Sequence, residues 1–288
     1  MKGKVLAVLA VTLLASFAFA LESGPSNPVG FFTTVVSHTP GIAGYNLVSF
    51  PTIPTDASLA NTLSNQVPGG AFAGAATQIM WFNNATGTFS TAWKTLSGST
   101  WNTAGGIATL DPKKGYYIVL RAGAANASYN VVVAGNVQTG PSYDMGTMGV
   151  GYNMIGSVWA APQALTASNL WTADLQRFRG GTFSGNSDQI RSFTGSAFLT
   201  VWMNNSNVWQ TSGAFSSFDP GKGFYVIRRA GRTPATFAWP DYPVPASAAD
   251  NMTTSIGSNP SVTAPVSIVP TSNDVAPVIK SKKATTAK

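Results

Sequence analysis

Residues 101–123 read WNTAGGIATLDPKKGYYIVLRAG, and residues 209–231 read WQTSGAFSSFDPGKGFYVIRRAG. The two stretches align without a gap, and 11 of their 23 positions are identical. Upstream, GYNLV at 44–48 recurs as GYNMI at 151–155. Matching motifs in the same order and at near-constant spacing indicate an internal repeat. The sequence therefore predicts a tandem duplication, with copies at roughly 29–140 and 141–243.

Each copy is predicted to consist mainly of β-strands, because its segments are rich in aromatic and β-branched residues and are separated by turn sequences. In the first copy the expected strands are 30–36, 45–50, 79–82, 88–95, 116–120 and 129–133. Apolar residues at helical spacing in 56–67 and 165–175 predict one short helix per copy. We therefore expect a mainly β fold of two tandem homologous β-rich domains, each a sandwich or a partly open barrel.

The N-terminus has the three-part pattern of a secretory signal peptide. Residues 1–20 combine a basic start, a continuous apolar stretch and the cleavage sequence Ala18-Phe19-Ala20. No other apolar stretch approaches the roughly 20 residues that are needed to cross a bilayer. We expect cleavage after Ala20, no integral membrane span in the mature chain, and an extracellular or cell-surface location.

The C-terminal residues 244–288 are rich in Pro, Ser, Thr and Ala and include four lysines, a composition typical of a flexible tail. Within this tail, VTAPVSIV at 262–269 has the composition of a strand that can join an open sheet edge. After the signal peptide, the expected organisation is a first domain at 21–140, a second domain at 141–243, and the basic tail.

The composition excludes several kinds of chemistry. The chain has no cysteine and one histidine, His38, so disulfides, thiolate metal sites and multi-histidine metal sites are impossible. Its single glutamate is Glu22, near the N-terminus. Of the net charge of +7, residues 21–250 contribute only +2, from 11 basic and 9 acidic groups, which argues against nucleic acid as a partner. We predict no cofactor and no enzymatic activity.

The best candidates for carboxylate chemistry are Asp111 and Asp219, which occupy equivalent positions in the two copies. Each precedes a proline and is followed four residues later by glycine, which is typical of a turn whose aspartate binds its own backbone. Equivalent placement in both copies favours structural turns over a catalytic pair. The residues assigned to these turns are Asp111, Pro112, Gly115, Asp219, Pro220 and Gly223.

Tryptophans offer a second kind of candidate site, because aromatic platforms on β-domains can stack on sugars. The repeated pairs Trp93/Trp202 and Trp101/Trp209 are more typical of core packing. The tryptophans without a counterpart are better candidates for a ligand-binding or interface role. They are Trp81, Trp159, Trp171 and Trp239.

The order of motifs in each copy resembles a module of secreted and surface bacterial proteins. In the first copy GYNLVSFP is followed by LDPKKGYYIV and then by a closing VVVAG strand, whereas the usual module has a GWNLISLP-like strand and a later LxPGxGYWV strand. The resemblance covers about residues 28–243 and implies a secreted or surface repeat protein of unassigned activity. Lys113 departs from the pattern, because the module and Gly221 of the second copy have glycine there.

These observations together predict a secreted, non-enzymatic structural protein that self-assembles into an extracellular filament, sheath or surface layer. A carbohydrate-binding or adhesive module is the first alternative, and an enzyme is the last. The predicted strand at 30–36 carries no charge to guard its edge. This strand, with Phe31, Phe32, Val35 and Val36, can therefore pair within its own domain or be donated to the next copy. The expected partners are copies of the same chain, or glycans.

Overall fold

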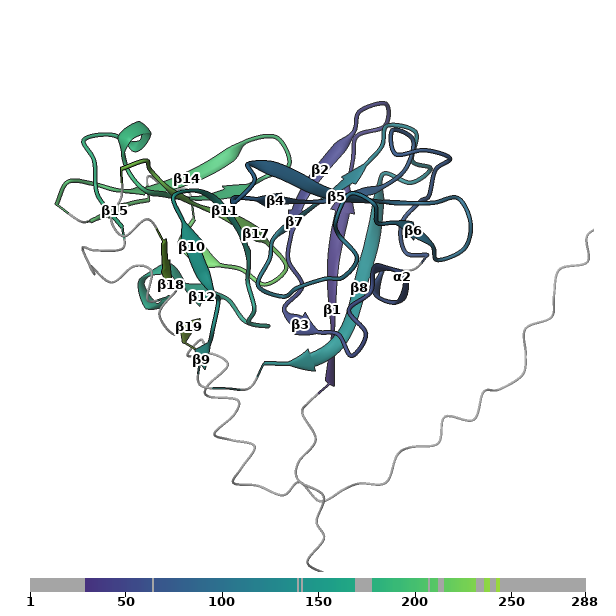
Figure 1. Cartoon of the computed structure of the whole chain (residues 1–288), viewed down its shortest axis with the longest axis horizontal. Helices are drawn as coiled ribbons and strands as arrows, with labels where there is room; N and C mark the ends of the chain where they lie inside the picture. The colour runs from purple at the N-terminus through teal and green to yellow at the C-terminus, as the bar shows by residue number, and fades with distance from the viewer. Residues whose placement is uncertain are drawn as a thin grey trace, which may run out of the picture.

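The computed structural model describes residues 29–63, 65–138, 140, 142–168, 178–206, 208–211, 215–231, 236–238 and 242–243. The predicted signal peptide and the predicted tail lie outside these residues. The described chain is mainly β, as the sequence predicted, and its sheets are antiparallel. Figure 1 shows residues 29–140, called the first unit below, beside residues 141–243, called the second unit.

Each unit contains one five-stranded sheet, and the two sheets have the same strand order. In the first unit the order is β2 (Gly44–Val48), β7 (Tyr116–Leu120), β4 (Gln78–Asn83), β5 (Thr88–Lys94) and β6 (Trp101–Asn102). In the second unit it is β11 (Gly151–Gly156), β17 (Gly223–Arg228), β13 (Gln189–Phe193), β14 (Phe198–Met203) and β15 (Trp209–Gln210). Strands at the same position in the two orders, such as β2 and β11 or β7 and β17, carry the motifs that align in the sequence.

A second, smaller set of strands flanks each sheet. In the first unit β1 (Val29–Ser37) pairs with β8 (Ser128–Val137) over nine residues, and β3 (Thr52–Ile53) pairs with the other side of β8. The corresponding pair in the second unit is β10 (Thr147–Gly149) with β18 (Thr236–Ala238), and it extends over only three residues. The remaining short pairs are β12 (Gln163–Ala164) with β16 (Ser217–Phe218), and β9 (Ser142–Tyr143) with β19 (Tyr242–Pro243).

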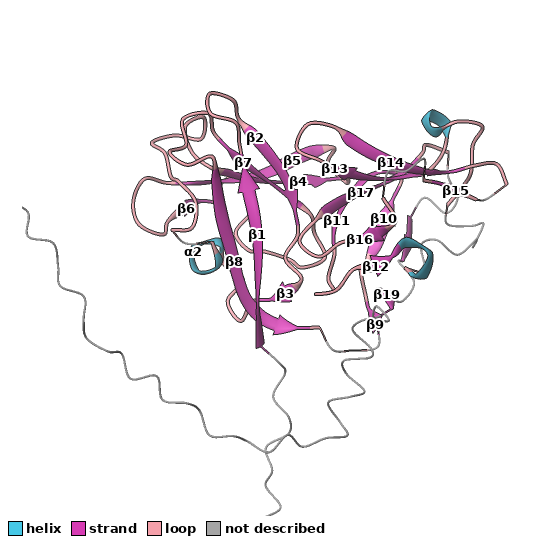
Figure 2. Cartoon of the chain, turned by 180° about the vertical axis from the view of Figure 1, so that it is seen from behind, coloured by secondary structure: helices cyan, strands magenta, loops and turns pink. Residues whose placement is uncertain are grey.

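Helical structure is sparse, as Figure 2 shows. The helix predicted at 56–67 is shorter than expected and spans only α2 (Leu59–Thr62). Beyond its end, the Gln66 amide donates to the Thr62 and Val132 carbonyls and accepts from the Val132 N–H of β8. Of the helix predicted at 165–175, the described part is a 3-10 turn, η1 (Leu165–Ala167), and a second such turn is η2 (Ser184–Asn186).

Three apolar clusters hold the fold together. One consists only of first-unit residues, among them Leu63, Ile79 and Ile118, and one only of second-unit residues, among them Trp159, Ile190 and Val226. The third joins the opposite faces of the two five-stranded sheets: Leu47, Tyr117 and Val119 pack against Met154, Tyr225 and Ile227. Both faces of each sheet therefore carry packed apolar residues. No sheet among the described strands closes into a barrel, so the sandwich form of the prediction applies.

Candidate functional site

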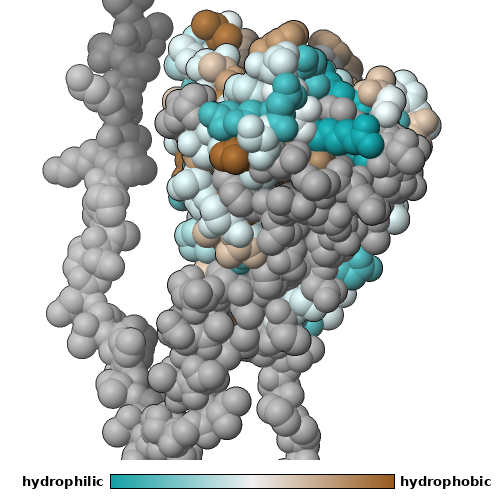
Figure 3. All heavy atoms as spheres, turned by 90° about the vertical axis from the view of Figure 1, so that its left-hand side faces the viewer, coloured by the Kyte–Doolittle hydropathy of each residue, from teal (hydrophilic) through white to brown (hydrophobic). Residues whose placement is uncertain are grey.

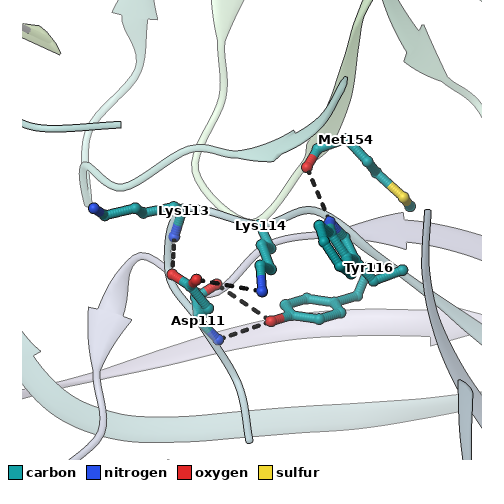
Figure 4. Close-up of polar contacts among 6 residues, drawn as sticks. Asp111, Lys113, Lys114, Tyr116 and Met154 are labelled. Atoms are coloured by element: carbon teal, nitrogen blue, oxygen red, sulfur yellow. Dashed lines mark hydrogen bonds and ion pairs between the residues drawn. The ribbon is translucent and has the colours of Figure 1, made fainter. Parts of the chain in front are cut away.

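The Asp-Pro turn of the first unit is fixed by its own side chains (Figure 4). The Asp111 carboxylate accepts a hydrogen bond from the Lys113 backbone N–H at 3.0 Å, and its other oxygen lies 3.6 Å from Lys114 Nζ. The Tyr116 hydroxyl accepts a hydrogen bond from the Asp111 backbone N–H at 2.8 Å. Lys114 also lies over the ring of Trp81, with Nζ 4.1 Å from the ring centroid. These contacts occupy both carboxylate oxygens in holding the turn.

The second-unit turn shares one backbone hydrogen bond with the first, in which Lys114 N–H donates to the Asp111 carbonyl at 3.0 Å, but its side chains bond differently. Lys222 N–H donates to the Asp219 carbonyl at 3.2 Å, and Lys222 Nζ lies 2.8 Å from the Asp219 carboxylate. Burial opposes ionisation of Asp219, but hydrogen bonds from Lys222 and Ser217 and the charge of Lys222 bring its pKa below the ordinary value. Gly221 adopts φ +77°, a conformation that glycine accepts readily. The equivalent residue of the first unit is Lys113.

The two turns also join the units, which the sequence did not predict. Gly156 N–H donates to the Lys113 carbonyl at 2.9 Å, and Ser49 N–H donates to the Gly221 carbonyl at 2.9 Å. Gly156 and Ser49 occupy corresponding positions, just after the GYN motifs, so the two bonds are reciprocal. Such reciprocity is the geometry of a two-fold related contact.

The glycine that ends each turn permits this close approach. A Cβ on Gly115 would lie 2.5 Å from the Ile155 carbonyl oxygen and 3.2 Å from the Gly223 Cα. A Cβ on Gly223 would lie 2.9 Å from both the Val48 carbonyl oxygen and Leu47 Cδ1. The glycines of the D-P-x-K-G motif are thus needed where backbone meets backbone, and we call this region the joint.

The side-chain amide of the asparagine in each GYN motif makes hydrogen bonds that a neighbouring strand would otherwise make. Asn46 accepts from Ser37 N–H at 2.9 Å and donates to the Ser37 carbonyl at 3.0 Å, and it also donates to Ile118 at 3.2 Å. Asn153 repeats these bonds with Gly149 N–H at 3.0 Å, with the Gly149 carbonyl at 2.8 Å and with Val226 at 3.1 Å. The amide therefore satisfies backbone groups where the outer strand diverges from the sheet.

The four tryptophans that the sequence analysis selected do not share one environment in the structure. Trp81 is partly buried beside the joint, where its Nε1–H points to the Met154 carbonyl at 3.4 Å. Trp159 is 1% exposed in the second-unit core, so its assignment to a surface role is wrong. Trp159 has no counterpart in the first copy, and its ring fills the core of the second unit. Trp171 and Trp239 lie outside the described residues.

In the part of the chain that the structure describes, the exposed aromatic residues are phenylalanines and tyrosines. A hollow of about 360 Å³ is lined by five rings, from Phe82, Phe89, Tyr152, Phe198 and Tyr225, together with Arg191 and Ile227. We call it the aromatic cleft. The first two rings come from the first unit and the other three from the second. The signal for it was present in the sequence, because Phe82/Phe193, Tyr45/Tyr152 and Tyr117/Tyr225 match between the copies.

Strand β1 supplies a second surface of interest. The hydrogen bonds between Gln66 and Val132 show that the backbone of Val132 faces away from β1. Its register partner Thr33 therefore points its N–H and C=O away from β8, and so do the other odd-numbered residues of β1. Asn46 covers Ser37, and the rest of that edge borders a groove of about 710 Å³ between the two units.

The outer face of β1 is also apolar. Val29 is 68% exposed, Phe31 77% and Val35 60%, whereas Val36 is fully buried in the first-unit core and Phe32 is partly buried. Val132 of β8 extends the same face. By contrast, Figure 3 shows the side of the second unit, where strongly hydrophobic residues are scattered among hydrophilic ones. In the single chain β1 pairs with its own β8, and its donation to another copy stays a prediction.

Two further observations bear on function. No group of three or more His, Cys, Asp or Glu residues is placed to hold a metal ion in the part of the chain that the structure describes. Within those same residues, no helix is long and apolar enough to span a membrane. Comparison with known proteins adds no further evidence: no family model, curated protein or solved structure matches this chain.

Proposed function

We propose that the protein is a secreted, non-enzymatic structural subunit that self-associates outside the cell into a filament, sheath or surface layer. In this proposal β1 of one copy pairs with β8 of the next, in place of the acceptor's own β1. The observation that carries the proposal is β1 itself, a nine-residue edge strand without a charged residue and with an exposed apolar row. Edges of this kind are normally protected by charge or by a covering segment.

The position of β1 in the chain favours donation over lateral pairing. It is the first described element, and the turn at Thr39–Ala43, with Gly41 at φ +82°, separates it from β2. A donated strand regains the same nine backbone pairings in the acceptor that it leaves in its own unit, so exchange has little enthalpic cost. Because each copy both donates and accepts, the contact is head-to-tail and propagates when its rotation does not close a ring.

A disulfide that locks β1 to its own β8 tests this proposal. Thr33 and Val132 are register partners that do not bond each other, so their Cα atoms lie at a spacing that suits a disulfide. Both side chains are exposed, and the chain has no other cysteine. We expect the oxidised Thr33→Cys/Val132→Cys protein to stay monomeric in electron micrographs and to polymerise after reduction, with each single variant as a control.

The other outcomes discriminate among the alternatives. Polymers of the oxidised variant would show that the chain assembles without strand donation. Absence of polymers from the native, mature protein at every concentration would overturn the structural-subunit proposal.

Glycan binding is the second candidate function, and the aromatic cleft is the observation that favours it. Phe89, Tyr152 and Phe198 are each more than 40% exposed, and their rings lie in one continuous surface that spans both units. Binding of an oligosaccharide to monomeric protein, measured by calorimetry, is the test of this alternative.

A further inference from the structure

The rings of the aromatic cleft form a contiguous series. Phe89 lies 5.2 Å from Phe82, Phe82 lies 6.1 Å from Tyr152, and Tyr152 lies 6.1 Å from Tyr225, measured between ring centroids. Phe198 follows at 5.9 Å from Tyr225. These are the separations of interacting aromatic pairs, so each ring is held by its neighbours before any ligand arrives.

The cleft is suited to a flat ligand with an apolar face. Its volume of about 360 Å³ lies at the lower end of the range for small-molecule sites. Aromatic faces carry a negative quadrupole potential, so they attract the positively polarised C–H groups of a sugar ring. Exposed rings at this density are an unfavourable surface in water, which indicates that the cleft is covered in the working protein.

One residue that lines the cleft, Arg191, is charged. Arg191, on β13, lies with its guanidinium 6.0 Å from the Phe198 ring centroid. Its Nε donates to Gln189 Oε1 at 2.7 Å, and Gln189 is in turn anchored to the Ser184 carbonyl. The guanidinium is therefore oriented by a buried side chain, and no ion pair with a carboxylate is found for it among the described residues.

The electrostatic surroundings of Arg191 favour an anion. Burial lowers the pKa of Arg191 most, the interaction with Tyr152 raises it by a smaller amount, and the charge of Arg229 lowers it again. The first unit has Met80 at the corresponding position of β4, one residue ahead of Trp81. A partly desolvated cation without a carboxylate partner, present in one unit and absent from the other, is a feature that core packing does not require.

We propose that the aromatic cleft binds a carboxylate-bearing saccharide, with the sugar ring stacked on the aromatic faces and its carboxylate paired with the Arg191 guanidinium. A planar guanidinium can engage a carboxylate through two parallel hydrogen bonds. The inference rests on the glycan-binding alternative, names its ligand class, and is independent of strand donation by β1.

Calorimetric titration of the mature, full-length protein tests the inference with two probes, tetragalacturonate and the carboxyl-reduced neutral tetrasaccharide. We expect the acidic probe to bind at least about tenfold more tightly, because charge-assisted hydrogen bonds are roughly twice as strong as neutral ones. Arg191→Met, which introduces the residue of the first unit, should abolish this preference. Phe198→Ala should weaken both probes.

Arg121→Met is the matched control, because it removes a cation that does not line the cleft. It should leave both affinities unchanged. Equal binding of the two probes, insensitive to Arg191→Met, would overturn the acidic-ligand inference and leave glycan binding standing. Absence of binding by both probes would overturn both. Equal binding of tetraglutamate and tetragalacturonate would show that the ligand class is wrong.

Discussion

The two units use the same residues to meet each other and different residues to face outward. At the joint, the D-P-x-K-G glycine of each unit lies against the backbone of the other, and within each unit the GYN asparagine makes the same backbone contacts. Outside it, the first unit has a nine-residue ladder of β1 with β8, where the second has only the three-residue pair of β10 with β18. Arg191 faces the cleft where the first unit has Met80. Matching residues therefore build the joint and the sheets, whereas the length of the β1 ladder and the charge of Arg191 differ between the units where we propose assembly and binding.

The largest expected effect is at the joint glycine of the first unit. A methyl group on Gly115 would meet the backbone of Ile155 and Gly223, which cannot move as a side chain can. We expect Gly115→Ala to lower the free energy of unfolding by about 2–3 kcal/mol, the upper range for overpacking, as measured by urea denaturation.

Two other glycines calibrate this result. Gly223→Ala should cost less, about 1–2 kcal/mol, because part of its contact is the flexible end of Leu47. Gly123→Ala, with nothing within 4 Å, should change stability by less than about 0.5 kcal/mol. Equal stability of the Gly115 and Gly123 variants would contradict the close approach of the units.

The asparagine pair tests whether the units are equivalent in energy as well as in geometry. Asn46→Ala and Asn153→Ala should each lower the free energy of unfolding by about 1–3 kcal/mol, because each leaves backbone groups unpaired. Exposed Asn130 on β8 is the control, and its alanine variant should be near neutral. A large difference between the two variants would show that the same hydrogen bonds contribute unequally to the free energy of unfolding in the two units.

A difference between the units should appear at alkaline pH. Burial raises the pKa of Tyr116 above the ordinary value of 10.0, and the second unit has Phe224 at this position. Because the folded-state pKa is the higher one, stability is fully present below pH 10 and is lost as the pH rises above it.

The expected slope is about 1.4 kcal/mol per pH unit for each such tyrosine. Burial also raises the pKa values of Tyr117 and Tyr225 at the interface, so these residues add to the loss. Tyr116→Phe should make the decline above pH 10 shallower in thermal melts recorded from pH 8 to 11. An unchanged pH profile would show that Tyr116 ionises as readily in the folded chain as in the unfolded one.

The smallest effects are expected at the turn carboxylates. Asp219→Ala should cost more than Asp111→Ala, both within about 0.5–2 kcal/mol, because Asp219 makes the shorter contact with its lysine. The lowered pKa of Asp219 also means that its contribution is present above the ordinary pKa of 3.8 and is lost as the pH falls through the folded-state value. Thermal melts of both variants measure the difference, and the reverse order would contradict the assignment of these contacts.

The sequence predicted the β-rich class because local composition and turn residues determine which segments are strands. It did not predict the pairing of β1 with β8, because this contact joins residues about 100 positions apart and depends on packing of the whole unit. The joint was missed for the same reason, since D-P-x-K-G resembles an isolated turn. The sequence misassigns Trp159, because a core position that is unique to one unit lacks a counterpart just as a surface position does. The Arg191/Met80 difference was visible in the aligned copies, but only the structure places it beside exposed rings.

The most direct test of strand donation mixes two single-cysteine chains, Thr33→Cys and Val132→Cys, under polymerising conditions and then oxidises them. The two positions are partners in the β1–β8 register, and the native chain contributes no thiol. Donation of β1 predicts a covalent heterodimer of the two chains on a non-reducing gel. If polymers form and the mixture yields no such heterodimer, while the double variant closes its disulfide within one chain, then β1 stays in its own unit and the account of assembly is wrong.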